Sequence, residues 1–374
     1  AATVERPRPP PVIGGRFGGR KQRQARHFTD QAVVRQCGLE DSGPKPLKVN
    51  GTTMIRKSPL AILAVVVCLA SPTAVSAQWT NRYPKVEGFG HQLYLEQENL
   101  PILSSGPTYP AASPDGKTVA FAHQGWIWLL DLQSGVARRL TNTSAVDARP
   151  RWSPDGERIA LVRDSGSDTA IVVVGLDGAV LSEIDTPAID LDPVFKGAGN
   201  FLIYTSAREG RLDLWRRNLA TGADEAVTTG ARAARAARAL GDGRIVYQEA
   251  IGPALGLKLR NADGTEGPVV FEQGWMAHLN PDSHPVERAI VYGVGDGNTV
   301  RLAVMDVDRP AFPRWLTPAG EKALFPTWSA NGSDIYFVLA DGSQQFRLMV
   351  IAAAGGTARP VEIERWDYGA QMGE

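Results

Sequence analysis

The chain has 374 residues, and its 40 basic and 40 acidic side chains give a formal net charge of zero. The charges are unevenly distributed: residues 1–77 hold 12 Lys and Arg against 4 Asp and Glu, which leaves 28 basic and 36 acidic residues in 78–374. An acidic body argues against nucleic acid as the main partner. Both cysteines, Cys37 and Cys68, precede residue 78, so the remainder can form neither a disulfide nor a thiolate metal site.

Residues 54–77 have the composition of a secretory signal peptide. Arg56 and Lys57 are followed by an apolar run at 60–70, which is short for a membrane span, and by small residues up to Ala77. We expect cleavage after Ala77 and a periplasmic or secreted product; a buried helix and a retained anchor are the alternatives. Residues 1–53, rich in Arg, Gly and Pro, are expected to be disordered or an extension wrongly placed ahead of a true start at Met54.

One four-residue turn occurs twice, as Ser113-Pro114-Asp115-Gly116 and as Ser153-Pro154-Asp155-Gly156. Proline presets φ for a turn, aspartate can bond back to the backbone, and glycine accepts a positive φ. An aliphatic run follows each copy, at 118–121 and at 159–162. Each copy therefore predicts a hairpin corner between two short strands.

Weaker versions of this corner recur along the chain at intervals of roughly 40 to 48 residues. We place the further corners at 196–200, 241–243, 280–287 and 329–332. Each unit also contains a third strand, a second glycine turn and a fourth strand that often ends in Leu-Thr, as at Leu140-Thr141. The spacing predicts an all-β fold, a six-bladed β-propeller of four-stranded antiparallel blades over 108–365.

Two segments of this region are less regular. Residues 231–239 place Arg at every third position, but they fall where a blade should begin, so we expect an irregular innermost strand there. Residues 78–107 form an entry segment, in which 91–96 could supply a strand that joins the first blade to the last.

The repeat itself resembles the WD40-like (PD40) repeat of TolB-type propellers. The resemblance rests on Pro-x-Trp-Ser-Pro-Asp-Gly, the aliphatic strand, the glycine-turned strand and Leu-Thr, and covers about 108–365. It implies a six-bladed propeller in the cell envelope that acts as a binding or scaffold module. The TolB type also has a separate α/β domain before its propeller, for which residues 78–107 leave no room.

The entry segment carries a second resemblance, through Gly90-His91-Gln92-Leu93 and Leu100-Pro101-Ile102-Leu103. It is similar to the start of exported bacterial proteins that join a TolB-like propeller to a C-terminal metal-dependent amidohydrolase. This resemblance implies an alternative, in which the chain is the noncatalytic N-terminal propeller of such an enzyme. Residues 366–374 would then begin a linker to a missing C-terminal domain.

The sequence contains no recognisable catalytic set. A metal-dependent hydrolase typically uses a His-x-His pair, and a serine peptidase of the propeller-bearing type needs Gly-x-Ser-x-Gly. Residues 78–374 contain neither pattern. We therefore expect no catalytic residue, no cofactor and no metal. The expected partner is a protein or peptide, or the missing C-terminal domain, with no nucleic acid and no transmembrane span after signal cleavage.

The candidate binding site lies at the mouth of the propeller's central channel. The residue before the first proline of a unit should lie on the innermost strand, and charged or aromatic side chains there are costly unless they are paired or bind a ligand. The alternative is a hydrated channel whose charges pair with one another. The candidate residues are Tyr109, Asp147, Arg149, Asp190, Asp192, Arg235, Arg238 and Phe325.

Overall fold

The computed structural model describes residues 86–88, 91–93, 101, 103–230, 232–251, 254–271, 277–295, 298–310, 313–341 and 345–369. The expected signal peptide at 54–77 and the segment 1–53 lie outside these residues and stay predictions. The described elements are all β-strands, and the expected all-β propeller is confirmed. None of the described residues forms a helix with the length and apolar character that crossing a membrane requires.

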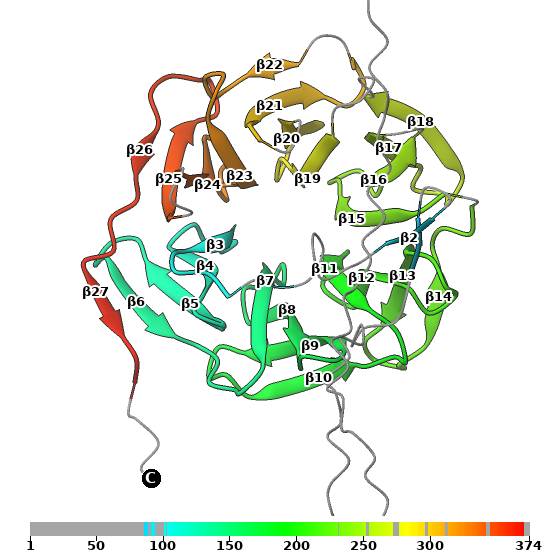
Figure 1. Cartoon of the computed structure of the whole chain (residues 1–374), viewed down its shortest axis with the longest axis horizontal. Coiled ribbons are helices and arrows are strands. Elements are labelled where there is room, and N and C mark those ends of the chain that lie inside the picture. Colours follow the sequence, from blue (N-terminus) through cyan, green and yellow to red (C-terminus); the bar gives the residue numbers. More distant parts are fainter. Residues whose placement is uncertain are drawn as a thin grey trace, which may run out of the picture. The chain divides into compact units, whose positions relative to one another are not determined.

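The described strands from residue 108 onward fall into six successive groups of four, here called blades 1 to 6, and a parallel pairing of Val300 with Lys322 joins the sheets of blades 5 and 6 (Figure 1). Blade 1 contains β3 Thr108–Ala112, β4 Thr118–His123, β5 Trp126–Asp131 and β6 Val136–Arg139, and blade 2 contains β7 Val146–Trp152, β8 Arg158–Asp164, β9 Thr169–Gly175 and β10 Val180–Ile184. Blade 3 contains β11 Asp190–Lys196, β12 Phe201–Ser206, β13 Asp213–Asn218 and β14 Asp224–Ala226, and blade 4 contains β15 Ala234–Ala239, β16 Ile245–Ile251, β17 Ala254–Arg260 and β18 Glu266–Phe271. Blade 5 contains β19 Ala277–Ser283, β20 Ala289–Gly295, β21 Val300–Asp306 and β22 Arg314–Trp315, and blade 6 contains β23 Lys322–Trp328, β24 Asp334–Ala340, β25 Phe346–Ala352 and β26 Arg359–Pro360.

The blades close into a ring through their innermost strands. Each of β3, β7, β11, β15, β19 and β23 contacts the next, and β23 contacts β3 (Figure 1). Apolar side chains fill the space between neighbouring blades; one cluster, for example, joins Ile171 and Ile184 of blade 2 to Leu191 and Leu202 of blade 3. Each small sheet thus covers its apolar faces with its neighbours.

Ring closure uses a strand that the sequence did not reveal. The strand β27 (Arg365–Asp367) pairs in parallel with β6 and adds a fifth strand to blade 1. Its Trp366 ring packs edge-on against Trp128, with centroids 4.9 Å apart. The latch expected from 91–96 does not form among the described residues, because β2 (His91–Leu93) pairs with β1 (Val86–Gly88) in a separate two-stranded sheet.

The repeated corner has the same hydrogen bonds in its copies. In blade 1 the Gly116 amide donates to the Ser113 carbonyl at 2.9 Å, and the Thr118 amide donates to Ser113 Oγ at 2.9 Å. The glycine serves two purposes. φ is +74° at Gly156 and +72° at the matching Gly116 and Gly332, and a Cβ on Gly156 would lie 3.8 Å from Cδ of Pro114 in the preceding blade. The corners therefore also contact one another from blade to blade.

The other repeated residues bind the strands together. The indole Nε1 of Trp152 donates to the Ala111 carbonyl of the preceding blade at 3.0 Å. The Leu-Thr motif lies just past the fourth strand, where Thr141 Oγ1 accepts a hydrogen bond from the Ile127 amide at 3.0 Å. Thr317 accepts one from Leu302 in the same way. The repeated tryptophan therefore connects neighbouring blades, and the Leu-Thr motif connects strands within a blade.

The corner of blade 5 lies further along the chain than expected. Residues 280–283, expected to begin that corner, belong to the innermost strand β19, and the corner follows them before β20. The expectation for residues 231–239 is confirmed, because Ala234–Ala239 forms the innermost strand β15 with a register shift in it.

Candidate functional site

Every innermost strand carries a β-bulge at the same place. The pairing with the second strand shifts register in all six, between Ala148 and Arg151 in blade 2 for example. A non-glycine residue with φ between 46 and 54° occupies each bulge. Positive φ is uncommon for such residues, and bulges redirect side chains. The six residues are Tyr109, Arg149, Asp192, Ala236, Asn280 and Phe325.

Four of these bulge residues touch in series across four blades. The rings of Phe325 and Tyr109 stack with their centroids 3.9 Å apart. The Arg149 guanidinium lies 5.2 Å from the centroid of the Tyr109 ring and forms an ion pair with Asp192. The structure therefore brings together the four candidate residues that were chosen from the sequence because each precedes a proline.

Arginines from blade 4 add to the charge around Asp192. Burial would raise the pKa of this carboxyl, but Arg149, Arg235 and Arg238 hold it below its ordinary value. Burial opposes the charge of Arg149 as well, yet Asp192 and Tyr109 raise the pKa of that guanidinium. The predicted residues Arg235 and Arg238 thus belong to the same electrostatic cluster as Arg149 and Asp192.

Asp282 of blade 5 is a second carboxylate of this cluster. Its Oδ1 lies 3.3 Å from Nε of Arg238, whose side chain is only 6% exposed. Its Oδ2 accepts hydrogen bonds from Thr327 Oγ1 at 3.0 Å and from the Trp328 amide at 2.9 Å. Asp282 therefore joins blades 4, 5 and 6 through one carboxylate.

Arg238 and Asp282 of this cluster line a cavity of about 350 Å³ beside the blade corners. The other predicted residues of the cluster are not among its lining residues: Tyr109, Arg149, Asp192, Arg235 and Phe325. Arg151, Arg238 and Asp282 line it together with corner residues of blades 1, 2, 5 and 6. Aromatic residues lining it are Trp152, Phe195 and Trp328. This combination of charged groups and aromatic rings suits recognition of a polar group carried by a larger ligand.

Arg151 is the least compensated charge in the cavity. Burial and the repulsion of Arg238 lower its pKa to about 9, although Asp282 and Asp192 act in the opposite direction. Among the described residues no hydrogen bond or ion pair of its guanidinium is found. Sequence reasoning missed Arg151 and Asp282, although each lies two residues beyond its bulge position.

The remaining two predicted residues, Asp147 and Asp190, are fully buried near the start of their strands. Asp147 accepts hydrogen bonds from Arg163 Nε at 2.8 Å and from Arg163 Nη2 at 3.0 Å. Asp190 accepts one from Thr186 Oγ1 at 2.8 Å, and burial raises its pKa to about 6. Neither is among the residues that line the cavity.

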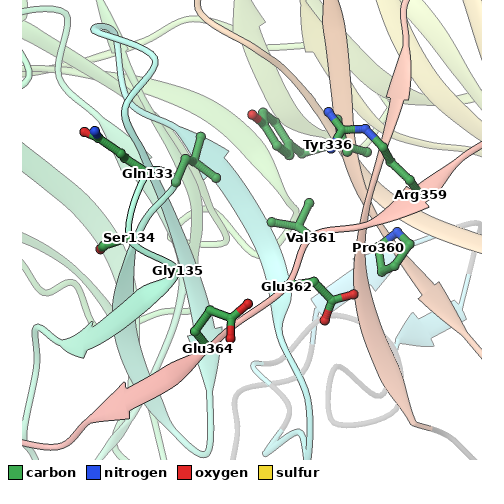
Figure 2. A pocket seen from close by; sticks show the side chains of 11 residues that line it. Gln133, Ser134, Gly135, Tyr336, Arg359, Pro360, Val361, Glu362 and Glu364 are labelled. Carbon is green, nitrogen blue, oxygen red and sulfur yellow. The ribbon is translucent and has the colours of Figure 1, made fainter.

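A different cavity, of about 370 Å³, lies at the outer rim (Figure 2). Figure 2 shows Glu364, on the segment that leads from β26 to β27, beside the turn at Ser134 and Gly135, and Glu362 further along the same segment. The Glu364 amide donates to the Gly135 carbonyl at 2.9 Å, and a Cβ on Gly135 would lie 2.5 Å from Glu364 Cγ. This cavity is therefore part of the ring closure.

A closed ring of antiparallel blades defines a β-propeller. A family model described as the TolB beta propeller domain matches residues 85–330, more than half of the chain. The chain belongs to this family.

Individual relatives match smaller parts of the chain. The Tol-Pal system protein TolB of Francisella tularensis subsp. mediasiatica (strain FSC147) is 25% identical over 135 residues, which are 34% of this chain and 30% of that protein. The chain thus matches about a third of that relative's length. The crystal structure of TolB from Acinetobacter baumannii is similar with a TM-score of 0.53 and 20% identity, over 60% of this chain and 57% of that one. This likeness concerns the fold.

Proposed function

We propose that this chain is an exported propeller that binds a protein or peptide partner at the corner side of its channel and performs no catalysis of its own. The observation that carries the proposal is the cavity lined by Arg151, Arg238 and Asp282 with aromatic residues around it. Burying charged side chains lowers the stability of a protein unless each charge is paired with an opposite one. Charged side chains that are not fully neutralised by their neighbours, at a cavity open to the surface, therefore favour a binding role.

Export to the periplasm or beyond is part of the same proposal. It is supported by the signal-peptide composition of 54–77 and by membership in the TolB propeller family. Fractionation of cells that produce the native protein tests it. The mature protein should appear in the periplasmic or extracellular fraction with Gln78 at its N-terminus, and a cytoplasmic, unprocessed chain would contradict this part.

Site-specific photocrosslinking in living cells tests the binding site. A photoreactive residue replaces Ala330, which lines the cavity, or Ala220, which is exposed in the β13–β14 turn and serves as the matched control. We expect a discrete adduct from position 330 and none from position 220. Equal adducts from both positions, or none from position 330, would contradict a partner at the channel mouth.

A further inference from the structure

The strand β27, which adds to the edge of blade 1, is held there by few backbone bonds and by one aromatic cluster. Its parallel pairing with β6 covers only the three residues Arg365–Asp367. Trp366 packs against Trp128 and also edge-on against Phe121, with centroids 5.9 Å apart. Segments with so few backbone bonds open at a low free energy, so the aromatic cluster determines whether β27 stays on β6.

One member of this cluster, His123 of β4, is of the type that titrates near neutral pH. Its ring lies against the Trp366 ring, with centroids 4.4 Å apart and an angle of 34° between the ring planes. The Trp128 ring lies further away, at 6.0 Å and close to edge-on. His123 is only 6% exposed. The side chain that anchors β27 is therefore in direct contact with a buried imidazole.

The surroundings of His123 suit a neutral imidazole and not a charged one. Its Nδ1 is buried and has no hydrogen-bond partner within the part of the chain that the structure describes. An imidazolium carries N–H on both nitrogens, so protonation would place a charge and an unpaired donor among aromatic rings. The attraction of a cation to a tryptophan ring is smaller than the cost of burying a charge without a partner.

Neighbouring charges do not offset protonation of His123. The titratable and charged side chains on the strands packed against β4, and on the residue that follows β27, are Tyr109 of β3, Asp131 of β5, Asp147, Arg149 and Arg151 of β7, Arg365 and Asp367 of β27, and Tyr368. None of these groups is among the influences on the pKa of His123. Burial lowers that pKa, and only the Gly106 backbone opposes the effect.

We propose that β27 is a proton-operated latch, in which protonation of His123 displaces Trp366 and releases β27 from the edge of β6. Release breaks three residues of pairing and the contacts of Trp366, whereas the innermost strands β23 and β3 stay in contact. The blades therefore remain assembled while the edge of β6 and the segment around Trp366 become available. This inference does not depend on a partner at the channel mouth.

The direction and the limit of the effect follow from proton linkage. In the released form His123 is exposed and takes up a proton with its ordinary pKa of 6.5, whereas in the latched form its pKa is lower. Protons therefore bind the released form preferentially, and the opening equilibrium rises as the pH falls. Between pH 7.5 and pH 5.5 it rises by up to about tenfold, the limit in which the latched form takes up no proton.

Amide hydrogen exchange of the full chain at pH 7.5 and pH 5.5, read by mass spectrometry, tests the proposal. The exchange of the β27 segment is converted to an opening constant with the rate of a synthetic peptide of the same sequence at each pH, because the chemistry of exchange itself depends on pH. We expect the opening constant of β27 to rise severalfold, up to about tenfold, at pH 5.5, and that of β8 in blade 2 to stay unchanged. An opening constant of β27 that is constant or falls would overturn the proposal, and so would an equal rise in β8.

Variants identify the titrating group. His123→Phe keeps an aromatic ring and His123→Gln keeps a polar side chain, and neither titrates, so both should remove the pH dependence of β27 opening. Asp190→Asn, which removes a buried acid of blade 3, should leave that dependence intact. The readout is a ratio between two pH values within one variant, so it is independent of whether a substitution itself weakens the latch, and protection of β8 verifies folding. A pH dependence that persists in both His123 variants, or disappears in Asp190→Asn, would refute the role of His123.

Discussion

The buried carboxyl of Asp190 should make the stability of the propeller depend on pH in a direction opposite to that of most acids. Its side chain is fully buried at the start of β11, and burial raises its pKa from 3.8 to about 6 against the opposing hydrogen bonds of Thr186 and the charge of Arg208. Asp190→Asn keeps the size of the side chain and removes the titration.

The magnitude follows from the two pKa values. Below pH 3.8 the carboxyl is protonated in both the folded and the unfolded chain, and it has no ionisation cost. Between pH 3.8 and about 6 the unfolded chain ionises while the folded chain keeps its proton, so folding loses stability as the pH rises. A shift of about two pKa units corresponds to about 3 kcal/mol, and this cost is constant above the folded-state pKa.

Urea unfolding of the wild type and the Asp190→Asn variant between pH 4 and pH 7 measures this effect. The free energy of unfolding of the variant relative to the wild type should rise by about 2.4 kcal/mol over that interval, because about 0.5 kcal/mol of the cost is already present at pH 4. Asp147→Asn is the matched control in blade 2, where Asp147 is bonded to Arg163, and it should lower stability by about 1–3 kcal/mol at neutral pH. A pH-independent difference for Asp190→Asn, or one that falls as the pH rises, would refute the reasoning.

Three further changes test how the blades are joined. Gly332→Ala should lower the free energy of unfolding in urea titrations by at least about 1–2 kcal/mol, because φ at this position is +72° and a Cβ would lie 2.0 Å from His284 Nε2. An unchanged midpoint of the urea unfolding curve would be inconsistent with this contact. Trp152→Phe should cost about 1 kcal/mol in the same assay through the lost bond to the Ala111 carbonyl, and a neutral result would show that this bond contributes nothing net. Trp366→Ala should expose the amides of β27 and β6 to hydrogen exchange before those of β8, whereas uniform protection would mean that β27 does not depend on its tryptophan.

The propeller fold could be predicted because its signals are local and repeated. Ser153-Pro154-Asp155-Gly156 determines a turn by its own chemistry, and the recurrence of such turns defines the blade length. The four bulge residues of the site could be found for the same reason, since each precedes a proline. Ala236 precedes no proline and was not found.

The features of the fold and of the candidate site that the sequence did not predict depend on contacts between distant parts of the chain. Asn280-Pro281-Asp282 resembles a turn in isolation, and only its pairing in β19 shows that it is a bulge. Arg151 and Asp282 were missed because their significance lies in charges that meet across the channel from different blades. The three-residue strand β27 has no sequence pattern of its own, and it forms because the edge of β6 is available.

The contact between successive corners affects how such a ring can change in evolution. Pro114 faces Gly156 and Pro154 faces Gly199, so the first three blades present the same complementary pair at their junctions. A duplicated or exchanged copy of blade 2 would meet compatible neighbours on both sides. Blade 6 instead accommodates His284 of blade 5 against Gly332, and these two blades would have to be inherited together.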